Sequence, residues 1–156
     1  MMLLKWTFVI LHIITAAAWF GLGLRLAGRA RSVLRLSGDA QTAVAEDGAR
    51  SVWLMNLFVV LTLVFSLGAF IAGGHFAAYG PAYHSAVTLI VVLTLVQLFV
   101  IRPGWNTLQA SVGPGADASD AAASAKTKVA IGTGVGHLLW LVLLGLMFWD
   151  QIAAVL

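Results

Sequence analysis

Four long apolar runs, separated by polar connections, dominate the pattern of this sequence. Each run is close to the roughly 20 residues that an α-helix needs to cross about 30 Å of hydrocarbon. The runs are continuously apolar and lack the alternation of barrel strands, so helices are expected. The sequence therefore predicts an all-α fold, a four-helix membrane bundle that forms one domain. The predicted spans cover residues 4–24, 52–74, 82–101 and 129–149.

The first run also allows a second interpretation, a cleaved secretory signal. The small residues Ala16, Ala17 and Ala18 resemble a cleavage site. However, the run is long and its arginines follow it, whereas a signal peptide carries its basic residues first. A membrane span is therefore the preferred interpretation.

Composition supports the membrane prediction. Of the 156 residues, 61% are hydrophobic and 10% are charged, whereas soluble domains average about 45–50% and about 25%. A domain of this size cannot hide so much apolar surface, so the surplus is expected to face the lipid bilayer. The absence of cysteine excludes disulfides, thiolate metal sites and cysteine nucleophiles. The net charge of +3 is modest, and nucleic acid is not an expected partner.

Basic residues indicate the orientation of the bundle. They gather in the connections 25–51 and 102–128, and the 75–81 connection carries no Lys or Arg. Because cytoplasmic loops are enriched in Lys and Arg, both basic connections are predicted to be cytoplasmic and both termini to lie outside. The expected location is the inner (cytoplasmic) membrane, as a multi-pass protein. Aromatic residues at the span ends agree, with Trp6, Tyr79, Tyr83 and Trp149 at the outer level and Trp53 and Trp105 at the inner level.

The connections differ in character. Residues 26–36 are predicted to continue the first helix, because apolar residues and arginines alternate there at near-helical spacing. Residues 37–48 are polar and are expected to form a loop. Residues 113–124, rich in Gly, Ala, Ser and Asp, are expected to form a mobile linker. Gly80 and Pro81 predict a tight turn that joins the second and third spans as a hairpin.

Four histidines, one associated with each span, carry the functional hypothesis. They are His12, His75, His84 and His137. Ionisable side chains are costly inside a bilayer and usually mark a functional site. The predicted spans contain no carboxylate, which argues against a carboxylate di-metal centre and an acidic proton relay. Neutral imidazole is instead a good ligand for haem iron, copper or zinc.

His12 has the neighbours expected of a cofactor ligand. Phe8, Ala16 and Trp19 share its helical face, so a small residue and two aromatic rings surround it. The ordinary alternatives stay open. His75 and His84 are expected to be solvated at the membrane surface, and His12 could simply hydrogen bond to another helix. The glycines before His137 would allow either close helix packing or clearance for a cofactor.

Depth along each span tests which histidines could pair. Counting at 1.5 Å per residue from the outer boundary places His84 about 3 Å, His12 about 10 Å and His137 about 18 Å deep. Helix tilts of about 20° would still permit His12 with His84, or His12 with His137. The candidate cofactor ligands are therefore His12, His84 and His137, with Trp19 beside them, and the candidate metal ligands are His12 and His84.

The segment from His12 to Trp19 and Phe20 resembles the first helix of a group of small four-helix membrane proteins. The group includes the CopD-like copper resistance proteins and the HemJ-type protoporphyrinogen oxidases, in which a histidine precedes Trp-Phe by seven residues. His84 at the start of the third span also matches the layout. The proline, histidine and lysine that the oxidases carry beyond the first helix are absent here. The resemblance therefore implies His12 as a ligand to b-type haem, or to copper.

The leading hypothesis is a membrane redox or metal-handling protein that binds b-type haem. One alternative is a non-catalytic accessory subunit that packs against other membrane subunits or against a second copy, since polar groups are scarce in the spans. Another is a copper-resistance protein, although the chain has only four methionines to supply soft ligands. Whether the protein is an enzyme is left open by the sequence.

Overall fold

The structure, a computed structural model, describes residues 2–112 and 120–155 of the chain. Every regular element in these residues is helical, and four helical segments are long and apolar enough to cross a membrane. The prediction of an all-α, four-span membrane bundle is therefore confirmed. In chain order the elements are α1 (Met2–Gly23), α2 (Leu26–Val33), α3 (Gly38–Ala72), α4 (His75–Ala78), α5 (Pro81–Val96), the π-helical turn η1 (Gln97–Ile101), α6 (Arg102–Ala110), α7 (Asp120–Met147) and α8 (Trp149–Ala153).

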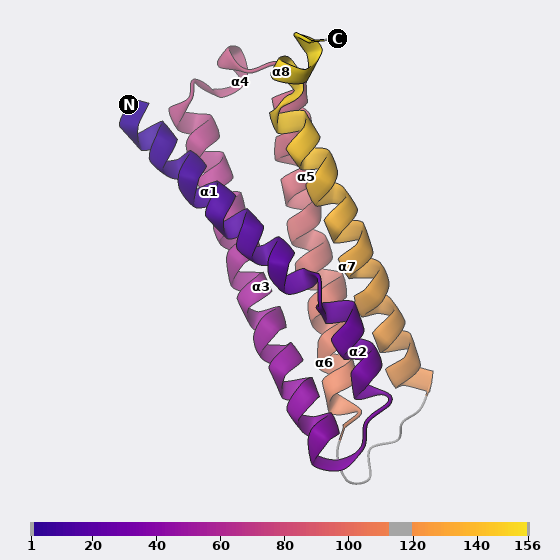
Figure 1. Cartoon of the computed structure of the whole chain (residues 1–156). Helices are drawn as coiled ribbons and strands as arrows, with labels where there is room; N and C mark the ends of the chain where they lie inside the picture. The colour runs from indigo at the N-terminus through magenta and orange to yellow at the C-terminus, as the bar shows by residue number, and fades with distance from the viewer. Residues whose placement is uncertain (1, 113–119, 156) are drawn as a thin grey trace.

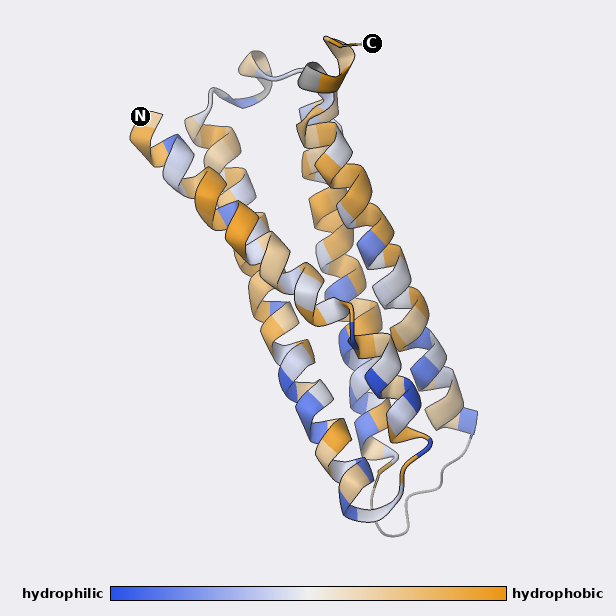
Figure 2. Cartoon of the chain, viewed as in Figure 1, coloured by the Kyte–Doolittle hydropathy of each residue, from blue (hydrophilic) through white to orange (hydrophobic). Residues whose placement is uncertain are grey.

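The helices extend beyond the predicted spans at the basic end of the bundle. Figure 2 shows hydrophobic residues along most of each long helix, and hydrophilic residues gathered where α2, α6 and the starts of α3 and α7 meet. The predicted continuation of the first helix is confirmed as α2, which follows a short break after Gly23. Leu26, Ala30 and Val33 are fully buried, at the i, i+4, i+7 spacing of one helical face.

Residues 37–48 do not form the predicted loop. Gly38 begins α3, and Gln41, through Nε2, donates a hydrogen bond of 2.8 Å to the carbonyl of Val33, which closes the connection. The segment is polar overall, yet Ala45 and Gly48 are buried on one face. A narrow face of small residues therefore supports a helix that composition alone does not reveal. Of the predicted 113–124 linker, residues 120–124 are helical and residues 113–119 lie outside the described residues.

The four spans pair as two hairpins that diverge toward the termini. Figure 1 shows α1 beside α3 and α5 beside α7, with the two pairs separating at the end where α1 starts and α8 lies. The positions of the buried residues agree with this divergence. Among the described residues, those buried in α1 start at Thr15, those in α3 stop at Thr62, and those in α5 start at Ile90. Most of the packed core thus lies in the basic half of the bundle, and Leu143 of α7 is buried beyond it. The predicted hairpin of the second and third spans is not formed as such, because α3 pairs with α1 and α5 pairs with α7. The connection between α3 and α5 is also longer than the predicted tight turn, since α4 lies within it.

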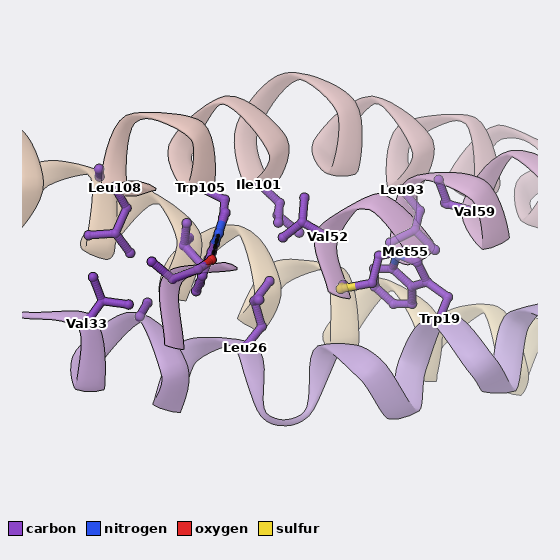
Figure 3. Close-up of a cluster of buried hydrophobic side chains, with 14 of the residues drawn as sticks. Trp19, Leu26, Val33, Val52, Met55, Val59, Leu93, Ile101, Trp105 and Leu108 are labelled. Carbon is purple, nitrogen blue, oxygen red and sulfur yellow. Dashed lines mark hydrogen bonds between the residues drawn. The ribbon is translucent and has the colours of Figure 1, made fainter. Parts of the chain in front are cut away.

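Trp105 is a core residue and not the interfacial aromatic that the sequence predicted. Its side chain is fully buried, and its Nε1 donates a hydrogen bond of 3.2 Å to the carbonyl of Ala45. Figure 3 shows it among buried side chains from several helices, including Ile101, Leu108 and Val52. The indole fits because α3 has no side chain at Gly48, where a methyl group would lie 1.8 Å from Cζ2 of Trp105. Trp53, by contrast, is 62% exposed, as an interfacial residue should be.

The Trp105–Gly48 contact provides a test of the core. We expect Gly48→Ala to lower the free energy of unfolding by about 1–3 kcal/mol, because overpacking forces the indole or the helix to move. Gly28→Ala is the matched control, since a methyl group there meets no atom within 4 Å. It should be neutral or stabilising by up to about 1 kcal/mol, as alanine is the better helix former. Thermal unfolding of both variants in detergent measures the difference, and equal behaviour would contradict the packing described here.

Candidate functional site

His12 is held at the interface of α1 and α3. Its Nδ1 lies 3.2 Å from the carbonyl oxygen of Thr62 and hydrogen bonds to it. A carbonyl can only accept, so Nδ1 carries the proton and Nε2 has a free lone pair in the neutral ring. Among the described residues no hydrogen bond to Nε2 is found. The ring is therefore fixed through one nitrogen, and the nitrogen that could bind a ligand is uncommitted.

Polar and aromatic contacts flank His12 along the same interface. One turn toward the core, the hydroxyl groups of Thr15 and Thr62 hydrogen bond to each other at 2.9 Å. One turn toward the outer end, the rings of Phe8 and Phe65 lie 6.3 Å apart, and Phe8 packs over Gly68. These contacts fix the two helices on both sides of the histidine. They also fit the simpler interpretation of His12 as one of several interhelical hydrogen bonds.

A buried amide network joins three of the spans at the point where the hairpins diverge. Gln97 is fully buried, and its Oε1 accepts a hydrogen bond of 3.1 Å from Nε1 of Trp19. Its Nε2 donates a hydrogen bond of 2.8 Å to Oδ1 of Asn56. Trp19 belongs to α1, Asn56 to α3, and Gln97 opens the π-helical turn η1. The network connects the first hairpin to the second.

The π-helical turn coincides with this network. Turns of this kind are rare and are found at functional positions more often than chance allows. Here Gln97 and Ile101, at the two ends of η1, are both fully buried. The extra residue in the turn changes the angular position of everything that follows, so that α6 can direct Trp105 into the core.

His137 lies at a third level, against the inner end of α1. Its ring centroid is 4.7 Å from that of Phe20 and 5.8 Å from that of Trp19, and Phe20 also packs on Trp140 at 4.4 Å. Its Nε2 is fully buried and has no hydrogen-bond partner in the described part of the chain. A methyl group at Gly23 would lie 2.6 Å from this nitrogen. His137 therefore occupies a close-packed notch.

His84 belongs to an aromatic cluster at the outer end. Its ring lies 6.4 Å from Phe70 in an edge-on arrangement, and Phe70 stacks on Tyr79 at 5.5 Å. The ammonium group of Lys5 lies 5.6 Å from the centroid of Tyr79. This cluster joins α1, α3 and α5 at the membrane surface. His75, at the start of α4, is exposed.

The histidines predicted as joint ligands are not brought together. On α3, His12 contacts Thr62 and His84 contacts Phe70, and these two contact points are eight residues apart. On α1, His137 contacts Phe20, which is eight residues from His12. Eight residues of helix correspond to about 12 Å. Two axial ligands of one iron must approach to about 4 Å, as metal–nitrogen bonds near 2 Å require. The order of depth predicted from the sequence is reproduced, but each histidine occupies its own site.

A shared metal site is equally unsupported by the geometry. In residues 2–112 and 120–155 no group of three or more His, Asp or Glu side chains could hold a metal ion. His12 and His84, predicted as metal ligands, lie at different levels. Gln97 and Asn56, polar residues within the predicted spans, were not among the candidate ligands, and their joint network was not predicted. The signal available was one amide in each of two largely apolar spans, Asn56 in the second and Gln97 in the third.

Comparison of the chain with protein-family models, with curated proteins and with solved structures finds no match.

The amide network can be tested by a double-mutant cycle. We expect Gln97→Leu to destabilise the protein, because it leaves Nε1 of Trp19 and Oδ1 of Asn56 without a partner in a dry environment. Combining it with Asn56→Leu should reveal a coupling free energy of about 0.6 kcal/mol, and no more than about 2 kcal/mol. Unfolding of the single and double variants in detergent supplies the four values. Strict additivity would show that the two amides do not interact.

Proposed function

We propose that this chain is an integral membrane redox protein that binds a b-type haem through Nε2 of His12. The observation that carries the proposal is the hydrogen bond between Nδ1 of His12 and the carbonyl of Thr62. Histidines that bind metals commonly donate their other ring N–H to a carbonyl or carboxylate, which fixes the tautomer and makes the ligating nitrogen more basic. His12 meets this condition.

The residues near His12 fit a single axial ligand better than a pair. His84 and His137 each lie about two helical turns away, so neither supplies a second nitrogen at the same iron. Ala16, one turn along α1 on the same face, presents little bulk beside the imidazole. The hairpins diverge beyond the level of Thr15, and the outer half has few buried residues.

In this proposal the chain holds and insulates the group. His12 supplies the iron ligand, and the Thr62 carbonyl keeps the ring in its ligating tautomer. The Phe8–Phe65 pair and the Thr15–Thr62 pair maintain the spacing of α1 and α3 on either side. A haem bound there would supply one-electron chemistry within the bilayer. The electron donor and acceptor would be other components of the membrane.

The haem proposal is tested by a dithionite-reduced minus oxidised spectrum of protein purified after haem-replete expression. We expect a b-type difference spectrum in the wild type that is lost in His12→Ala. The matched control is His84→Ala, which removes an imidazole at another level. It should retain the spectrum, because it removes neither the ligand nor the Thr62 carbonyl that anchors it.

Two outcomes would contradict the proposal. A featureless spectrum in the wild type would show that the protein binds no haem. It would favour an accessory subunit that binds other membrane subunits or a second copy. A spectrum that survives in His12→Ala but disappears in His137→Ala would move the ligand to the inner notch.

A copper-resistance role has less support, since the described residues do not group the ligands that a copper site needs.

We further propose that the basic end of the bundle faces the cytoplasm, in the inner membrane. All five Lys and Arg residues between the first two spans lie at this end, within or beside α2 and the start of α3. The start of α1 and the end of α7 both lie at the opposite end of the bundle (Figure 1). The enrichment of Lys and Arg in cytoplasmic loops gives this orientation.

The absence of cysteine makes the orientation easy to measure. Gly80→Cys and Thr42→Cys each introduce one exposed thiol, the first at the connection before α5 and the second near the start of α3. In spheroplasts of a bacterial host, a membrane-impermeant maleimide should label the Gly80→Cys protein. The Thr42→Cys protein should react only after lysis. The reverse pattern would invert the proposed topology.

A further inference from the structure

A surface groove runs between the third and fourth spans at the basic end of the bundle. One wall comes from η1 and α6, the other from the first part of α7. Two adjoining hollows of about 580 Å³ and 430 Å³ share Val100, Ser124 and Lys128 in their lining. We call this feature the α6–α7 groove. It is separate from the histidine levels described above.

Small residues and the π-helical turn create the groove. Gly104 brings α6 close to α7, since a methyl group there would lie 3.1 Å from Cγ2 of Val129. Gly132 does the same beneath η1, where a methyl group would lie 2.9 Å from Cγ1 of Ile101. The backbones thus meet at the floor, while Ser124 on the α7 wall is too small to fill the space above it. The hollow remains open at the surface.

The lining changes from apolar to polar along the helix axes. The side toward the centre of the bundle carries Phe99 and Ile131, which are 71% and 61% exposed. The side toward the chain connections carries the hydroxyl of Ser124 and the ammonium group of Lys128. Lys128 and Ile131 are three residues apart, or about 4.5 Å along α7. A ligand filling the groove would be apolar at one end and hydrogen-bonding or anionic at the other.

Within residues 2–112 and 120–155, no ion pair neutralises the charges at the groove. Lys126 and Lys128 both line it, and among the described residues neither forms an ion pair. The ion pair that is present joins Arg29 and Asp47, between α2 and α3. Asp120, at the start of α7, is two helical turns from Lys128, or about 12 Å along the axis. The local field therefore favours an anion.

We propose that the α6–α7 groove binds an anionic phospholipid. The phosphate would interact with Lys128, Lys126 and Ser124, and one acyl chain would lie over Phe99, Val100 and Ile131. Charge favours an anionic over a zwitterionic lipid. A zwitterionic headgroup carries its own cation, so its electrostatic attraction to two lysines is weaker. Basic pockets between spans at this membrane level are suited to such headgroups. The inference does not depend on the haem proposal.

The test is native mass spectrometry of the full chain in detergent, titrated with phosphatidylglycerol or with phosphatidylcholine of the same acyl chains. We expect retained phosphatidylglycerol in the wild type, with an affinity about fivefold lower in Lys128→Gln, the value for one basic residue near a membrane surface. Arg31→Gln is the matched control. It removes the same charge at the same end, from an exposed position on α2 that does not line the groove.

A second variant separates a built site from general attraction. Ser124→Phe fills the groove without changing charge, at an exposed position where folding should tolerate it. We expect it to abolish retention of phosphatidylglycerol, and millimolar inorganic phosphate should not displace the lipid from the wild type. Three results would overturn the proposal: equal retention of both lipids, equal losses in Lys128→Gln and Arg31→Gln, or undiminished binding in Ser124→Phe.

Discussion

The hydrogen bonds of Gln97 are the constraint on which the rest of the bundle depends. A buried amide has no water to bond with in a bilayer, so its donors and acceptor must find partners on other helices. Gln97 finds them on both helices of the other hairpin, at Trp19 and Asn56. This fixes the third span against the first hairpin at one height. On the inner side of that point the four spans pack closely, and on the outer side the hairpins diverge (Figure 1).

The packing of the inner half follows from the turn that Gln97 begins. A π-helical turn accommodates an extra residue and rotates the following helix relative to an uninterrupted one. With that rotation α6 buries Trp105 and Leu108, and Trp105 meets α3 where Gly48 leaves room (Figure 3). The same turn places Phe99 and Val100 at the wall of the α6–α7 groove. A polar contact buried between the two hairpins therefore determines both the core and the shape of the surface beside it.

Hydropathy predicted the spans, their number and the depth order of the histidines, because these depend only on position along each helix. It could not predict which way a side chain faces. Trp105 was expected at the interface because Trp is common there, yet the rotation at η1 directs it inward. Residues 38–48 were expected to be a loop because their composition is polar. Their helix is stabilised by contacts of two small residues with distant helices, and local sequence carries no signal for such contacts.

The contrast between two histidines explains why the haem proposal rests on the outer one. At His137 the unpartnered Nε2 is enclosed, with the Gly23 backbone against it and Trp19 and Met55 buried nearby. Such a nitrogen costs about 1–3 kcal/mol when it lacks a partner, a cost that close packing of the aromatic rings can offset. A macrocycle would have to displace that packing and forfeit the compensation. At His12 the anchored nitrogen Nδ1 already has its hydrogen bond, so a ligand at Nε2 would add a bond without removing that contact.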